Sequence, residues 1–132
     1  MNNPERDPFE VLYDRARARP MHVVLSEGED ARVRRAAAEI LRRGLARLTL
    51  IGPRESFQSE FEYPESVRIE DPRTSGFADE CAAAYHRLRA HKGVTEGQAR
   101  DAVRDPRVFA NLLVHLGQAD GCVSGAVYTA PT

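Results

Sequence analysis

The sequence lacks tryptophan, has only two cysteines, and carries a formal net charge of −1 at pH 7. The cysteines, Cys81 and Cys122, show no C-x-x-C spacing, so a disulfide framework or zinc site is not indicated, and we expect two reduced, buried thiols. The near-neutral net charge shows no excess of basic residues of the kind that binds nucleic acid. We therefore expect no nucleic-acid partner.

Long apolar runs are also missing. No stretch approaches the roughly 18–20 apolar residues of a membrane span, and no amino-terminal segment has the apolar core of a secretory signal peptide. We therefore expect a cytoplasmic protein that does not use a membrane. The four histidines share no metal-ligand spacing, and no metal site is expected.

What is present is the composition of one ordinary domain. The chain has 132 residues, of which 42% are hydrophobic and 30% charged, and a domain of this size buries roughly two-thirds of its unfolded surface. Apolar runs predict strands at 23–25, 48–51, 67–69 and 120–123. Helical periodicity and capping residues predict helices at 8–19, 31–43, 77–91, 95–103 and 106–116.

Strands that alternate with helices predict an α/β fold, a three-layer sandwich with a mostly parallel sheet. We divide the chain into an amino-terminal helix and tail at 1–20 and an α/β domain at 21–132. The last strand is expected to be central and buried, although nothing later in the sequence covers its free side. Two readings stay open: the strand is an edge of a complete fold, or the chain is the amino-terminal part of a longer fold that associates.

Two turns at the carboxyl ends of strands are candidates for function, because ligands of open α/β sheets bind there. After the last strand, Ser124-Gly125-Ala126 offers a hydroxyl and free backbone N–H groups that can cradle a phosphate; the alternative is a tight turn. After the first strand, the acidic run 27–30 repels phosphate and has no phosphate-loop motif, so a capping role is expected, with Arg32 pairing to the acids. Asp120 is expected to fix the turn that enters the last strand.

Three segments in this order resemble the phosphate acetyl/butyryltransferase family. They are LSEGEDARV at 25–33 with LIG at 50–52, then LRAHKGVT at 88–95, then the run from Asp105 to Ala126, which contains GQADG and VSGA. The resemblance covers most of residues 20 to 130. It is closer to phosphotransacetylase proper than to the related carboxyl-terminal domain of some malic enzymes.

This resemblance implies transfer of an acetyl group between coenzyme A and inorganic phosphate, with coenzyme A and acetyl-CoA as substrates and no bound cofactor or metal. It also implies two α/β domains around a cleft and a homodimer. In such a mechanism the coenzyme A thiolate attacks the acetyl phosphate carbonyl. A carboxylate acts as base, and serine and arginine stabilise the developing charge.

The resemblance also assigns candidate binding residues. Arg89 matches an arginine that binds a coenzyme A phosphate, and Lys92 adds a second positive charge; the alternatives are a solvated helix-end arginine and a C-cap lysine. Ser124, Gly125 and Thr129 match the small-residue loop at the cleft.

The departures from the family pattern define the remaining expectations. The family's catalytic serine, arginine and aspartate lie far downstream of the VSGA loop, and Tyr128 stands where a histidine is usual. We therefore expect a truncated member, incomplete relative to the two-domain fold, with no catalytic residue of its own and little or no activity alone. The alternative is a non-catalytic module that binds coenzyme A or nucleotide, or dimerises, like the regulatory domain of some malic enzymes.

Overall fold

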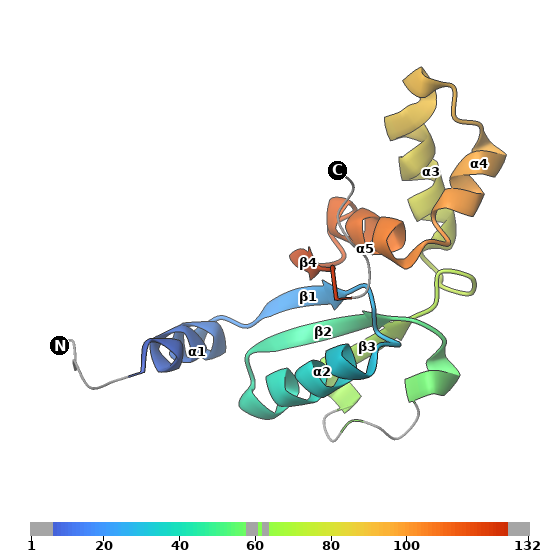
Figure 1. Ribbon diagram of the computed structural model, residues 1–132. Helices are drawn as coiled ribbons and strands as arrows, with labels where there is room; N and C mark the ends of the chain where they lie inside the picture. Colours follow the sequence, from blue (N-terminus) through green and yellow to red (C-terminus); the bar gives the residue numbers. More distant parts are fainter. Residues whose placement is uncertain (1–6, 58–60, 62–63, 127–132) are drawn as a thin grey trace.

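The computed structural model describes residues 7–57, residue 61 and residues 64–126 (Figure 1). In this part of the chain, four parallel strands form one sheet in the order β3–β2–β1–β4. The strands are β1 (Met21–Leu25), β2 (Ala46–Ile51), β3 (Val67–Glu70) and β4 (Gly121–Val123). The helices are α1 (Pro8–Ala18), α2 (Ala31–Arg43), α3 (Ala78–Arg89), α4 (Glu96–Ala102) and α5 (Pro106–His115), with short 3-10 turns η1 (Arg54–Phe57), η2 (Pro64–Ser66) and η3 (Ala90–Lys92).

Helix α2 covers one face of this sheet, and α5 and the first part of α3 pack on the other, while the rest of α3 projects away (Figure 1). The predicted three-layer α/β sandwich with a parallel sheet is therefore confirmed. None of the helices in the described ranges combines the length and the apolar character needed to cross a membrane.

The helix ends follow from local chemistry. The Asp30 side chain accepts a hydrogen bond from the Arg32 N–H at the start of α2, and Asp105 does the same for α5. Helix α2 ends at Gly44, whose φ of 67° lies in the left-handed region that favours glycine. Thr95 and Gln98 form a capping box at the start of α4.

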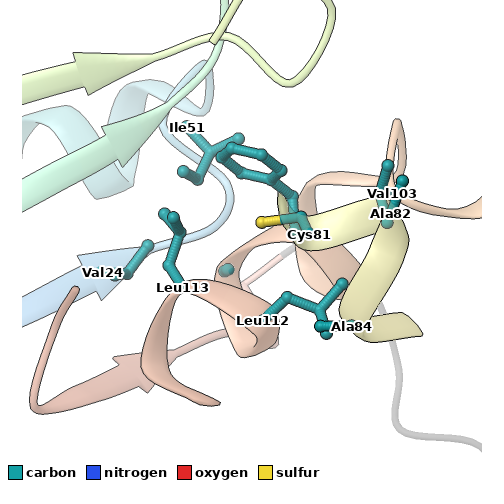
Figure 2. Packing of buried hydrophobic residues seen from close by; sticks show 10 residues of the cluster. Val24, Ile51, Cys81, Ala82, Ala84, Val103, Leu112 and Leu113 are labelled. Carbon is teal, nitrogen blue, oxygen red and sulfur yellow. The ribbon is translucent and has the colours of Figure 1, made fainter. Parts of the chain in front are cut away.

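The core lies in two layers because successive strand residues point to opposite faces of the sheet. Leu25, Leu48 and Leu50 pack against α2. On the opposite face, Val24 and Ile51 pack against buried residues of α3 and α5 (Figure 2). The largest fully buried side chain there is Phe109, which has no exposed surface.

The expectation of a central, buried last strand is wrong. Strand β4 pairs only with β1 and lies at the edge of the sheet that the described residues form. As a result Val123 is 60% exposed. Cys122 is half-buried rather than buried, whereas Cys81 is fully buried as predicted.

Two other apolar patterns also face solvent. Helix α1 extends away from the sheet (Figure 1), and the side chains of Phe9 and Leu12 are 61% and 54% exposed. Leu88 is also 48% exposed, near the outer end of α3. Helical periodicity locates a helix but does not say whether another element covers its apolar side chains.

We expect Phe109→Ala to lower the free energy of unfolding by about 3–5 kcal/mol, because it leaves a cavity in the core. Phe9→Ala, the matched control on α1, should change it by no more than about 0.5 kcal/mol, because that ring is exposed. Urea denaturation of both variants measures the difference. A Phe9→Ala cost as large as that of Phe109→Ala would show that α1 packs into a core.

Candidate functional site

The turns after β1 and β4 lie side by side at the carboxyl edge of the sheet. The register pairs Leu25 with Val123, which brings Ser26 next to Ser124. Their hydroxyl oxygens are 2.5 Å apart, and the Ser26 N–H donates to the Val123 carbonyl at 3.4 Å. Ser26 is buried and Ser124 is exposed. The two candidate turns therefore form a single structural unit.

The carboxylate of Glu27 holds residues 124–126, which we call the β4 turn. One oxygen, Oε1, accepts hydrogen bonds from the N–H of Gly125 at 2.5 Å and of Ala126 at 3.1 Å. Glu27 is only 7% exposed, and Gly125 has a φ of 113°. The N–H groups that we expected to be free for a phosphate are thus bound to an internal anion. The capping role expected for the acidic run is confirmed by Asp30 at the start of α2. In addition, Glu27 of this run binds the backbone of the β4 turn.

Gly28 explains how Glu27 reaches this position. A Cβ atom at Gly28 would lie 2.7 Å from the Ile51 carbonyl oxygen, which is closer than real Cβ atoms come to backbone. The chain after β1 therefore runs directly against the end of β2, where only glycine fits without a shift. This close packing fixes the backbone that carries the Glu27 side chain.

Arg32 also belongs to this site. Its pairing with the acidic run was predicted, but its contact with the β4 turn was not. Its Nη2 donates to Asp30 Oδ2 at 3.0 Å, as expected, and also to the Ala126 carbonyl at 2.8 Å. The side-chain hydrogen bonds from Arg32 lower the pKa of Asp30 to about 2. A guanidinium therefore lies against the β4 turn, a contact between residues 94 positions apart that local spacing does not reveal.

Two open cavities flank the joined turns. An apolar groove of about 390 Å³ runs between α2 and the β1–β4 side of the sheet, with Glu27, Ser124 and Ala126 among its lining residues. A more polar hollow of about 280 Å³ lies over the acidic run, between Gly52 and Pro106. The carboxyl edge thus offers space of the size that small ligands occupy.

The other predicted binding residues lie elsewhere. Arg89 and Lys92 are both exposed at the outer end of α3 and in η3, away from the sheet (Figure 1). The Arg89 guanidinium lies 5.9 Å from the centre of the Tyr85 ring. The structure does not bring these two cations to the β4 turn, and Thr129 lies outside the described residues.

His22 and Asp120 have structural contacts. The Asp120 carboxylate accepts the His22 N–H at 2.8 Å, and the His22 carbonyl accepts the Asp120 N–H at 2.8 Å, so Asp120 fixes the entry to β4 as predicted. Burial lowers the pKa of His22, and the charges of Arg47 and Arg68 lower it further. No group of three or more potential metal ligands occurs among the residues that the structure describes.

Comparison with known proteins gives a consistent result. The family model described as phosphate acetyl/butaryl transferase matches residues 9–132. A phosphate acetyltransferase of Paracoccus denitrificans is 43% identical over 122 residues, which are 92% of this chain and 36% of that protein. A phosphate acetyltransferase of Synechocystis sp. is 41% identical over 124 residues, 89% of this chain and 18% of that protein.

Solved structures agree with the sequence matches. The EutD phosphotransacetylase from Staphylococcus aureus superposes with a TM-score of 0.79 at 29% identity, covering 92% of this chain and 38% of that one. A phosphotransacetylase from Streptococcus pyogenes gives 0.78 at the same identity and coverage. The chain therefore spans well under half the length of these relatives. All four are named for acetyl transfer, so they lend no support to the regulatory-module alternative.

Proposed function

The chain belongs to the phosphate acetyl/butaryl transferase family, and on this basis we propose that it serves acyl transfer between coenzyme A and inorganic phosphate. The observation that carries the proposal is the family match over residues 9–132. Residues 21–132 then form part of the first α/β domain of that fold. The chain covers 18 to 36% of the length of the two relatives named above. We therefore propose, for this chain, the activity, the substrates and the partners that the family membership implies.

In the proposed reaction, the coenzyme A thiolate attacks the acetyl phosphate carbonyl carbon. A carbon–sulfur bond forms, the bond from the acyl carbon to the phosphate oxygen breaks, and inorganic phosphate leaves. Negative charge develops on the carbonyl oxygen and must be met by positioned donors. By the family resemblance, the residues that meet this charge follow the β4 turn in sequence, so we assign the described residues to binding and positioning.

We propose that one coenzyme A molecule contacts both candidate regions. Its phosphate groups and its thiol are at opposite parts of an extended molecule, so one ligand can contact both regions. We propose that Arg89 and Lys92 bind the phosphates at the outer end of α3, and that Ser124, Gly125 and Thr129 lie at the acyl end. Exposed cations near a helix end suit phosphate oxygens, and arginine adds two parallel hydrogen bonds.

For coenzyme A binding, we expect Arg89→Ala to raise the dissociation constant about tenfold or more, because it removes a charge-assisted hydrogen bond. Arg87→Ala is the matched control, since Arg87 is also exposed and lies two residues away on the same helix. Isothermal titration calorimetry measures both. Equal losses in the two variants, or no binding by the wild-type chain, would count against the assignment.

For turnover, we expect the 132-residue chain alone to form acetyl-CoA from acetyl phosphate far below the ordinary enzyme range of about 1–10³ s⁻¹. The reason is the downstream position of the family's catalytic residues. Thioester absorbance with purified protein measures the rate. Turnover within that range would place the complete catalytic centre in these residues.

We also propose self-association through the β4 edge, where Val123 is 60% exposed beside the apolar groove. Val123→Asp should shift a dimer to monomer in sedimentation velocity, because it puts a charge into the apolar contact. Leu12→Asp, on the exposed face of α1, is the control and should leave the dimer intact. A monomeric wild-type chain, or a dimer that tolerates Val123→Asp, would refute this.

A further inference from the structure

The β4 turn has the backbone arrangement of an anion site. Two successive N–H groups, from Gly125 and Ala126, converge on a single oxygen atom. Gly125 has a φ of 113°, a conformation that lets consecutive N–H groups point the same way. Such N–H pairs bind phosphates and other anions in many proteins. Here the anion is supplied by the chain itself, as the carboxylate of Glu27.

The sheet holds Glu27 firmly in this position. Glu27 directly follows buried Ser26, whose hydroxyl contacts Ser124, and precedes Gly28, which is packed against the Ile51 carbonyl. Glu27 is buried, with only 7% of its surface exposed. Hydrogen bonds from N–H groups to a carboxylate are about twice as strong as neutral ones. The internal anion is therefore both fixed in place and bound through strong contacts.

We propose that Glu27 reserves the β4 turn, so that a ligand phosphate or carboxylate binds the Gly125 and Ala126 N–H groups only by displacing the Glu27 carboxylate. The two anions cannot share the N–H pair, because both seek the same donors and repel each other. Displacement exposes the donors and leaves the guanidinium of Arg32, which contacts the Ala126 carbonyl, beside the incoming anion. The proposal concerns the same turn as the proposed function but needs no acyl transfer.

The test is a titration with inorganic phosphate, followed by the ¹H–¹⁵N amide resonances of Gly125 and Ala126, against chloride at matched ionic strength. In Glu27→Ala these resonances should move saturably, with an apparent dissociation constant at least tenfold lower than in the wild-type chain. Glu29→Ala is the matched control: it removes the same charge from the same turn, but Glu29 is exposed, and the carboxylate that Gly125 and Ala126 contact is that of Glu27. It should respond like the wild-type chain.

Glu27→Gln is a second variant, which keeps the test decisive if Glu27→Ala does not fold. Glutamine keeps an oxygen at this position but carries no charge, so phosphate should compete with it more successfully than with glutamate. The proposal is overturned if a folded Glu27→Ala or Glu27→Gln chain binds phosphate at the turn no better than wild type. It is also overturned if Glu29→Ala gains as much as Glu27→Ala. Because the probe is phosphate alone, failure here is distinct from failure of the coenzyme A or turnover experiments.

Discussion

The hydrogen bonds from Gly125 and Ala126 to the Glu27 carboxylate fix the region on which the rest of the account depends. Strand β4 has three residues and one neighbouring strand among the described residues, so its own ladder is short. Its two ends are held instead by side chains of the adjoining segments. Asp120 binds the backbone of His22 at the entry, and Glu27 binds the backbone of the β4 turn at the exit. Hydrogen bonds to an ionised carboxylate are stronger than neutral ones, so these contacts hold the two ends of the short edge strand.

This arrangement changes the picture of the candidate site. Sequence reasoning described an open, small-residue loop, whereas the structure shows a loop whose donors already have an acceptor. The positive charges predicted for coenzyme A lie at the outer end of α3, whereas the guanidinium of Arg32 contacts the β4 turn. The outer end of α3 and the β4 turn are therefore two separate regions of the molecule, and of these two regions the β4 turn is the one that contacts Glu27.

Local chemistry explains which features the sequence could predict. Caps such as Asp30, Thr95 and Asp105 act over two or three residues, so the helix starts were readable directly. The edge position of β4 could not be read from the sequence in this way, because the order of strands in a sheet depends on which distant segments pair. The Glu27 contacts to the β4 turn join residues 98 and 99 positions apart, and no periodicity encodes them. The family motifs did locate the turn, since VSGA and the acidic run occur in a recognisable order, but they gave no geometry.

Hydrogen exchange of the Gly125 amide tests the central claim most directly, because that N–H makes the shorter contact with Glu27. We expect this amide to be protected in the wild-type chain and to lose protection in Glu27→Ala, while amides of α5 around Phe109 keep theirs. A Gly125 amide that exchanges equally fast in both chains, with α5 unchanged, would show that Glu27 does not hold the turn.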